Sequence, residues 1–305
     1  MAGCGRYAPT PSGDLHIGNL RTAVLAWALA RQSGRRFHLR IEDIERTVPG
    51  AAERQMADLA ALGIDWDGPV VYQTARTDAH RAALERLIEL GLTYECYCTR
   101  KDIREAASAP NAEPGRYPGT CRDLDEDARR AGRAKLAKLG RKPALRLRAD
   151  GARWGIEDEV VGPYSAAVDD IVLRRGDGVV AYNLAVAVDD AWAGVDQVCR
   201  ADDLLSSAPS QAFVGHLLGL EPVPTYAHVP LVVNERGDRL AKRDGAVTMT
   251  DLARCGWGPA DVVRAIGESL DIPGARCAAD IRDHLDLEWL RARGGRPWVF
   301  TPPCP

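Results

Sequence analysis

The tetrapeptide His16-Ile17-Gly18-Asn19 places an imidazole and an amide on either side of a residue that has no side chain. The glycine lets a flat ring approach the backbone closely, and the two polar groups can hydrogen-bond beside it. Much later in the chain, a basic, glycine-flanked loop at 234–245 contains Lys242. Imidazole, amide and ammonium groups can stabilise negative charge that grows on phosphate oxygens. By itself, the tetrapeptide would be interpreted as a surface histidine that precedes a helix.

The surrounding sequence predicts a strand, a tight turn and a helix. An extended start at residue 6 meets Pro9, Pro11 and Gly13, which interrupt a strand and cannot lie inside a helix. Apolar residues then recur at helical spacing, at Ile17, Leu20, Val24, Leu25 and Leu29. In an open parallel sheet, such a turn lies at the carboxyl end of the first strand. Helix amides and the positive end of the helix dipole favour an anion there.

Charged residues follow two other predicted strands. Residues 36–41 alternate with period two, so Glu42 lies at the carboxyl end of a strand and can face the same crevice as Arg6. Alternatively, Glu42 belongs to an acidic turn of the kind that often ends a strand. Arg200 ends the predicted strand that begins at Val198, again at the rim. Its alternative is a salt bridge with an acid two or three residues later.

A continuously apolar run at 178–190 predicts another buried strand of the parallel sheet. Tyr182 lies in this run and would, by itself, be assigned to the core.

Three cysteines, Cys96, Cys98 and Cys121, could supply thiolates to a tetrahedral zinc ion, which takes four ligands in structural sites. No nearby histidine provides the fourth ligand, so three reduced thiols are an equal alternative. The remaining cysteines, Cys255 and Cys304 among them, are expected to be buried or incidental thiols, since a disulfide framework is typical of small secreted domains.

The composition is that of an ordinary globular protein. The chain has 305 residues, of which 46% are hydrophobic, and a net charge of −3. That charge creates no global attraction for nucleic acid, so RNA contacts must come from local basic stretches such as 129–148. We find neither an apolar run long enough for a membrane span nor a charged-then-apolar signal at the start, and we expect a cytoplasmic protein.

Together, the separated motifs resemble class I aminoacyl-tRNA synthetases. Residues 16–19 are similar to the H-I-G-H element, and Arg239–Arg243 to K-M-S-K-S. Residues 6–13 and 40–43 resemble the glutamyl branch of that class. Asn19 replaces the second histidine, whereas Arg239 and Ala241 replace a lysine and a serine; Lys242 matches. The resemblance implies an α/β fold, a Rossmann-type doubly wound parallel sheet with an inserted zinc-containing module and a short helical C-terminal part.

The resemblance also implies roles for individual residues. The residues expected to bind L-glutamate are Arg6, Ala8, Thr10, Glu42, Tyr182 and Arg200. Those expected to bind ATP, which brings Mg²⁺, are His16, Gly18, Asn19 and Lys242. The expected catalytic residues are His16, Asn19, Lys242 and Arg243. One structural Zn²⁺ per chain would be held by Cys96, Cys98, Tyr117 and Cys121.

Four regions are expected. Residues 1–91 and 176–250 would form the two halves of the nucleotide-binding catalytic domain, 92–175 the inserted zinc module, and 251–305 a short helical region. A glutamate-activating core without a large anticodon-binding domain looks like the glutamyl-queuosine tRNA(Asp) synthetases, which esterify glutamate onto queuosine in the tRNA(Asp) anticodon loop. The alternatives are a short glutamyl-tRNA synthetase that charges the tRNA 3′ end and a non-catalytic tRNA-binding paralogue. The expected partners are glutamate, ATP and queuosine-containing tRNA(Asp), with no membrane, and we expect a monomer.

Overall fold

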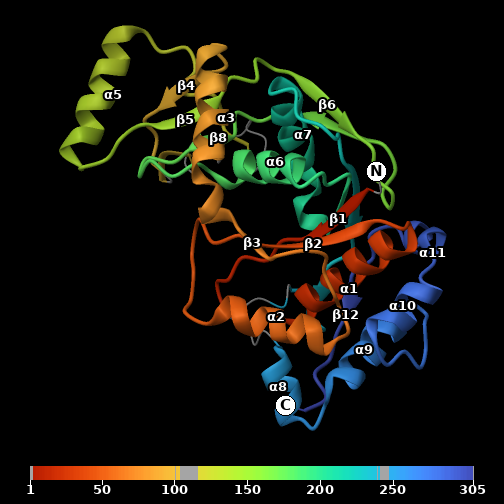
Figure 1. Cartoon of the computed structure of the whole chain (residues 1–305). Coiled ribbons are helices and arrows are strands. Elements are labelled where there is room, and N and C mark those ends of the chain that lie inside the picture. The colour runs from red at the N-terminus through yellow and green to blue at the C-terminus, as the bar shows by residue number, and fades with distance from the viewer. Residues whose placement is uncertain (1–2, 100, 104–115, 239, 241–246, 305) are drawn as a thin grey trace.

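The computed structural model describes residues 3–99, 101–103, 116–238, 240 and 247–304. Its centre is a five-stranded, all-parallel sheet with strand order β10-β9-β1-β2-β3 (Figure 1). The strands are β1 (Cys4–Tyr7), β2 (Arg36–Ile41), β3 (Val71–Tyr72), β9 (Gln197–Ala201) and β10 (Thr225–Val229). The chain adds β2 and β3 on one side of β1, and later β9 and β10 on the other. The carboxyl ends of β1 and β9 therefore flank a topological switch point, where such sheets bind ligands.

Helices cover both faces of the sheet (Figure 1). Helix α1 (Ile17–Gln32) is buried almost all round, since it is packed between the sheet and the C-terminal helices. The C-terminal helices are α8 (Met249–Arg254), α9 (Pro259–Glu268), α10 (Ala278–His284) and α11 (Leu287–Ala292). The helices of the opposite face are α3 (Thr77–Glu89), α6 (Tyr182–Trp192) and α7 (Ala208–Leu217). Helix α2 (Ala51–Ala61) lies on the same face of the sheet as α1.

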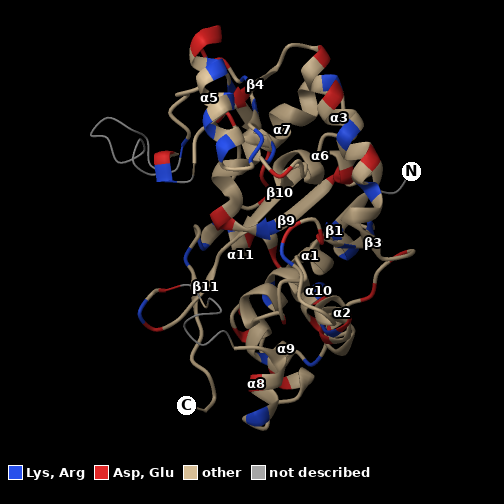
Figure 2. Ribbon diagram, turned by 90° about the vertical axis from the view of Figure 1, so that its left-hand side faces the viewer, with Lys and Arg blue, Asp and Glu red and all other residues tan. Residues whose placement is uncertain are grey.

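A second, smaller set of strands interrupts the chain between β3 and β9. An antiparallel sheet has the order β4 (Thr93–Cys96), β5 (Ala144–Leu147) and β8 (Val172–Arg174). Helix α5 (Glu126–Lys138) projects from this sheet, with acids in its first turn, and the charged residues after them are all basic (Figure 2). A separate hairpin consists of β6 (Arg153–Ile156) and β7 (Tyr164–Ala167). Helix α7 packs against it, which connects the hairpin to the main fold.

The strand predicted at 178–190 is wrong. Apart from an isolated bridge at Val180, this run forms helix α6, which begins at Tyr182. An apolar run of this length is compatible with a buried helix as well as a buried strand, and periodicity cannot distinguish them. The helix buries Leu184, Ala185 and Val188 on its apolar side and also buries two acids, Asp189 and Asp190.

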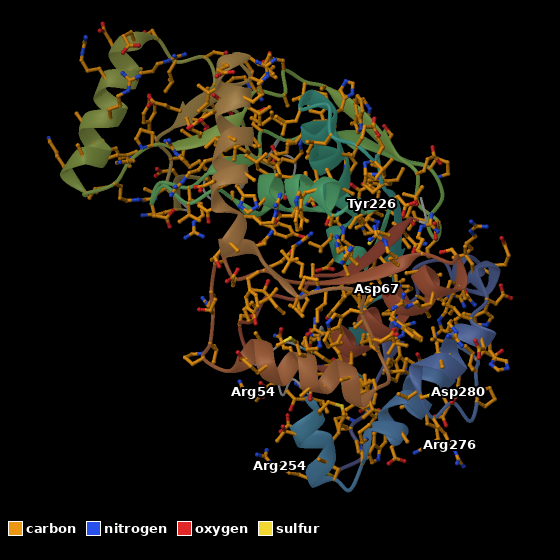
Figure 3. All side chains as sticks on the ribbon, in the orientation of Figure 1. Arg54, Asp67, Tyr226, Arg254, Arg276 and Asp280 are labelled. Carbon is orange, nitrogen blue, oxygen red and sulfur yellow. A yellow bond between two sulfur atoms is a disulfide. The ribbon has the colours of Figure 1, made fainter. Side chains whose placement is uncertain are left out.

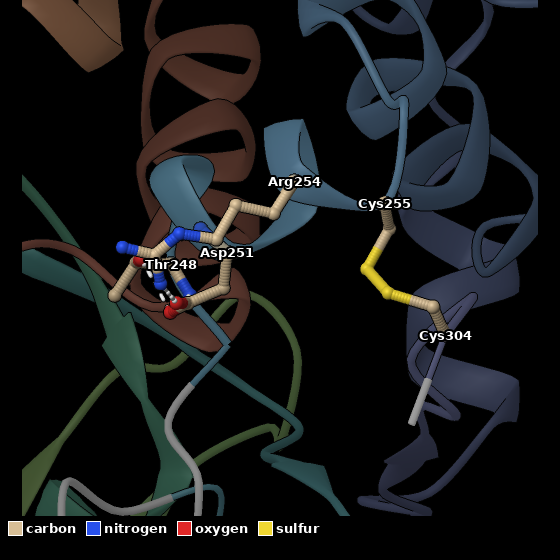
Figure 4. The surroundings of a disulfide bond; sticks show 5 residues. All are labelled: Thr248, Asp251, Arg254, Cys255 and Cys304. Carbon is tan, nitrogen blue, oxygen red and sulfur yellow. Dashed lines mark hydrogen bonds and ion pairs between the residues drawn. A yellow bond between two sulfur atoms is a disulfide. The ribbon is translucent and has the colours of Figure 1, made fainter.

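The C-terminal region is tied to the rest of the chain at two places. Strand β12 (Trp298–Val299) pairs in parallel with β11 (Val232–Val233). A disulfide joins Cys255, directly after α8, to Cys304 (Figure 4). The expectation of incidental thiols is therefore wrong for these two cysteines. Among the described residues, no helix is both long and apolar enough to cross a membrane.

Candidate active site

His16 and Asn19 together form the N-cap of α1. The Nδ1 atom of His16 accepts hydrogen bonds from the backbone N–H groups of Gly18 (3.1 Å) and Asn19 (3.4 Å). In return, Asn19 Oδ1 accepts from the backbone N–H of His16 (3.3 Å), which completes a capping box. Because Nδ1 is an acceptor, we assign the ring proton of the neutral imidazole to Nε2. The predicted turn thus places an imidazole donor at the positive end of a helix.

The backbone amides of this turn are already hydrogen-bonded. Ile17 N–H donates to Val247 O (2.9 Å), and the next two amides donate to the His16 ring. The expectation that helix amides would bind an anion directly therefore needs correction. A phosphate at this end of α1 would interact with side chains and with the helix dipole, not with backbone N–H groups that lack a partner.

Gly18 is required by its neighbours within the protein. A Cβ added at this position would lie 3.0 Å from His16 Cε1 and 3.4 Å from Val232 Cβ. The ring that Gly18 admits is therefore the capping imidazole of His16, which a larger residue would push away. The sequence predicted the close approach of a flat ring without specifying which one, and the expected contact of Gly18 with ATP stays a prediction.

Lys242 and Arg243, like Arg239 and Ala241, lie outside the described residues. The chain on either side of them can be placed. Leu240 and Val247 are buried in the same hydrophobic core as Ile17. Thr248 forms an isolated β-bridge with His16. Val247 and Thr248, the first described residues after Lys242, therefore lie directly against the N-terminus of α1.

A buried ion-pair network links β1, β2 and α6. Asp190 accepts from Arg40 Nη1 at 2.6 Å and from Arg6 Nε at 3.3 Å. Arg40 Nη2 also donates to Glu42 at 3.2 Å, and all four side chains are at most 10% exposed. The sequence pointed to Arg6 and Glu42 but missed Arg40 and Asp190. The only signals were a basic residue within an alternating strand and an acid that ends an apolar run.

The network shifts the pKa values of its two acids in opposite directions. Burial raises the pKa of Glu42, and the neighbouring Arg40 and Arg6 only partly oppose this. Burial alone would also raise the pKa of Asp190, but Arg40 and Arg6 hold it below its ordinary value. Asp190 is therefore the fixed anion that keeps two arginines charged beside each other.

Arg200 lies at the carboxyl end of β9 and is 6% exposed. Its Nη1 donates to Gln211 Oε1 (2.7 Å), and its Nε donates to His228 Nε2 (3.0 Å). Tyr182 begins α6 and is half-buried. Burial raises the pKa of the Tyr182 hydroxyl; Glu42 acts in the same direction, and Arg200 and Arg6 oppose it. These groups from four elements thus share one electrostatic environment.

Ala8 and Thr10 follow β1 in the turn that leads to α1. Ala8 is half-buried and Thr10 is exposed. Between them, Pro9 O accepts from the backbone N–H of Glu42 (3.0 Å). Gln55 Nε2 donates to Thr10 O (3.1 Å), which ties the turn to α2. The hydrogen bond at Pro9 places the turn beside the end of β2, as the sequence predicted.

The four candidate zinc ligands converge in the antiparallel module. The sulfur atoms of Cys96, Cys98 and Cys121 lie within 4.8 Å of one another. The hydroxyl of Tyr117 is 3.4 Å from Cys96 Sγ and 3.6 Å from Cys98 Sγ. Hydrogen bonds from Cys121 and Cys98 lower the pKa of the Cys96 thiol, whereas burial raises the pKa of Tyr117. Three thiols and one hydroxyl around a common centre fit a four-coordinate ion, although the phenol needs the cation to replace its proton.

The sequence was also compared with known proteins. Residues 4–267 match the family model of the catalytic domain of class I tRNA synthetases (E and Q). The chain is 60% identical over 301 residues to the glutamyl-Q tRNA(Asp) synthetase of Nocardia farcinica, covering 99% of this chain and 94% of that protein. It is 47% identical over 274 residues to the protein of the same name from Cutibacterium acnes, covering 88% and 76%.

The fold is shared with a solved structure as well. A glutamate tRNA ligase from Elizabethkingia meningosepticum, crystallised in complex with its amino acid, superposes with a TM-score of 0.78 at 22% identity, covering 99% of this chain and 68% of that chain. The chain therefore belongs to the glutamyl-Q tRNA(Asp) synthetase family of class I aminoacyl-tRNA synthetase-like ligases.

Proposed function

We propose that this chain uses ATP to convert L-glutamate to glutamyl-adenylate and transfers the glutamyl group to the queuosine base in the anticodon loop of tRNA(Asp). The observation that carries the proposal is the set of charged groups at the switch point. Arg6 lies in β1 next to its last residue, Glu42 directly follows β2, and Arg200 lies near the carboxyl end of β9, across the switch point from them. The printed names of the relatives supply the choice of acceptor.

Glutamate matches this charge pattern. Its two carboxylates need two cations, which Arg6 and Arg200 provide, and its ammonium can pair with Glu42. Arg6 donates hydrogen bonds to Asp190 and to the carbonyl of Cys199, which fixes the guanidinium in place. Tyr182, Ala8 and Thr10 complete the proposed pocket. A site built on buried donors rejects an analogue that leaves them unpaired by factors of about 10⁴.

The activation step is an attack by the α-carboxylate of glutamate on the α-phosphorus of ATP. The new bond forms between a carboxylate oxygen and phosphorus, and pyrophosphate leaves with the electrons of the broken P–O bond. His16, through Nε2–H, and Asn19 would stabilise the charge on the phosphate oxygens, and Lys242 and Arg243 are proposed to do so from the second motif. Mg²⁺ enters with ATP and neutralises the polyphosphate. No covalent enzyme intermediate is needed.

We also propose one structural zinc ion at Cys96, Cys98, Tyr117 and Cys121. The convergence of these ligands from β4 and the segment that precedes α5 supports it. A site with four protein ligands has no open position for a substrate, so the zinc would stabilise the module. Because the proposed substrates are ATP and tRNA, we infer a cytoplasmic location.

Pyrophosphate exchange is the first test. The chain should catalyse ATP–pyrophosphate exchange that depends on glutamate and is much weaker with glutamine. Absence of exchange would favour the non-catalytic paralogue.

The acceptor is tested next with tRNA(Asp) that contains or lacks queuosine. Glutamate incorporation only into the queuosine form supports the proposal, whereas equal incorporation into both, or into neither, contradicts it. Charging of tRNA(Glu) that is abolished by periodate oxidation of its 3′ end would support the 3′-charging alternative.

A further inference from the structure

We propose that His228, held by Asp158, is a positioning residue that orients the guanidinium of Arg200 and thereby sets the affinity for glutamate. This inference rests on the proposed function, in which Arg200 binds a carboxylate of glutamate. It concerns two residues that no motif in the sequence indicated.

The three side chains form a buried relay. Arg200 Nε donates to His228 Nε2 at 3.0 Å, and His228 Nδ1 is 2.5 Å from Asp158 Oδ2. Arg200 and Asp158 are each 6% exposed, and His228 is 1% exposed. Because an arginine can only donate, His228 Nε2 must accept, so the proton of the neutral imidazole lies on Nδ1 and points to Asp158. The relay therefore fixes both the tautomer and the ring plane of His228.

The backbone holds Asp158 in turn. Its Oδ1 accepts from the N–H groups of Val160 and Val161, both at 2.9 Å. The backbone N–H of His228 also donates to the carboxylate, at 3.2 Å to Oδ2. Hydrogen bonds join the segment around Asp158 to β10, from Tyr226 N–H to Glu157 O (2.8 Å) and from Glu159 N–H to Tyr226 O (2.6 Å). The segment between β6 and β7 therefore anchors a group at the proposed substrate site.

The relay limits how Arg200 can rotate. Gln211 accepts from Nη1, and its own NH₂ group donates to Asn183 Oδ1 (2.8 Å). Tyr226 lies between the sheet and the α6–α7 layer, with its ring centre 5.4 Å from Arg200 Cζ (Figure 3). Without the acceptor at Nε, the guanidinium keeps its hydrogen bonds from Nη1 to Gln211 Oε1 and from Nη2 to Leu204 O (3.2 Å), but its Nε edge is no longer fixed. A misaligned guanidinium loses the two-point contact with a carboxylate.

The Asp158→Asn substitution tests this relay with almost no change in volume. Three backbone N–H groups reach the Oδ1 position, those of Val160, Val161 and His228 (3.3 Å), so the oxygen of the new amide is favoured there and its NH₂ group faces His228 Nδ1. The imidazole then has to carry its proton on Nε2, and two N–H groups face each other between His228 and Arg200. We expect the KM for glutamate in ATP–pyrophosphate exchange to rise by about tenfold to a hundredfold, the range for losing a hydrogen bond to a charged group. The KM for ATP should stay within about twofold.

Two substitutions of His228 form a matched pair. In His228→Gln, the side-chain oxygen can reach the former Nε2 position and still accept from Arg200. In His228→Asn, the shorter amide reaches only the former Nδ1 position and bonds Asp158 alone. We expect the glutamine variant to keep a near-native KM for glutamate and the asparagine variant to resemble Asp158→Asn. Equal glutamate KM values in the two variants would contradict the proposal. This pair also provides the test if Asp158→Asn does not fold.

The controls separate positioning from general damage. Glu159→Gln changes the neighbouring carboxylate, which accepts from Gln197 (3.0 Å) and does not belong to the relay, so its KM for glutamate should be unchanged. In an Arg200→Ala background, Asp158→Asn should raise the KM for glutamate by less than about a further twofold, because the relay acts only through Arg200. If the wild-type protein exchanges with glutamate but Asp158→Asn leaves that KM unchanged, the relay proposal fails and the proposed function stands. Absence of exchange in the wild type would contradict both the proposed function and the relay proposal.

Discussion

Asp190→Asn should strongly destabilise the folded protein. Asp190 is the anion between Arg6 and Arg40, at 3.3 and 2.6 Å, in a site where these side chains are at most 10% exposed. The substitution leaves two buried guanidinium groups with Glu42 and the more distant charge of Asp189, which is already paired with Arg76, to balance them. Removing one partner of a buried ion pair costs about 3–5 kcal/mol. With a slope of about 3 kcal/mol per molar urea for a chain of this size, the unfolding midpoint should fall by roughly 1–1.7 M.

The assay is urea unfolding followed by tryptophan fluorescence at pH 7. Glu89→Gln serves as the matched control, because Glu89 pairs with Arg86 at 3.3 Å while both side chains are more than half exposed. That control should change the free energy of unfolding by less than about 0.5 kcal/mol. If Asp190→Asn costs less than about 1 kcal/mol, the network does not depend on this carboxylate and the reasoning is wrong.

The pH dependence supplies a second readout of the same variant. The pKa of Asp190 is held below its ordinary value in the folded state, so its contribution to stability is present at neutral pH. That contribution disappears as the pH falls below the ordinary carboxyl range and through the folded-state pKa. The difference in unfolding free energy between wild type and Asp190→Asn should therefore shrink on acidification. A difference that stays constant from pH 7 to pH 3 would contradict the assigned charge.

Three further predictions concern other parts of the molecule. His16→Ala should slow glutamate-dependent ATP–pyrophosphate exchange by roughly a hundredfold, because losing one preorganised hydrogen-bond donor usually raises the barrier by about 3 kcal/mol. Exchange at the wild-type rate would refute this role. Cys121→Ser should lower the zinc content, measured by atomic emission, from about one ion per chain to a small fraction of that, and wild-type protein purified without zinc would contradict the site. Burial raises the pKa of Asp58 to about 6, so its ionisation costs stability as the pH rises from about 4 to 6. Asp58→Asn should therefore stabilise the protein at pH 7 by on the order of 1 kcal/mol, allowing for partial exposure to solvent, and by almost nothing at pH 4; an equal effect at both pH values would exclude the charge as the cause.

The elements that the sequence predicted well are those with local signals. The turn before α1 contains Pro9, Pro11 and Gly13, and β2 alternates between apolar and polar residues, so neighbouring residues determine both. The three cysteines of the candidate zinc site were also indicated by their sequence, since they lie within 26 residues, whereas Tyr117 was implied only by the family resemblance. Helix α6 was mistaken for a strand, because a short buried run contains no period that separates the two.

The partners of the site residues could not be predicted, because folding brings them together over long distances in the sequence. Arg40 and Asp190 are 150 residues apart, and His228 and Asp158 are 70 apart. Nothing in the local sequence of either residue specifies the other. The same holds for the disulfide, whose cysteines are 49 residues apart and follow no spacing motif. Sequence patterns thus indicated which side chains carry the proposed chemistry but not which residues hold them in place.

The Cys255–Cys304 bond makes the support beneath α1 depend on the redox environment. The bond closes a ring that contains α9, α10 and α11, and α9 and α10 bury their apolar sides in the core that holds α1. Closing a loop of this length restricts the unfolded chain by about 4 kcal/mol in the chain-entropy model. Since folded proteins are stable by only about 5–15 kcal/mol, a thiol reductant would remove a large share of that margin. Reduction would therefore loosen α9 and α10, which pack in the same core as α1, the helix that has His16 at its N-cap. It would do so without changing any residue of the proposed pocket.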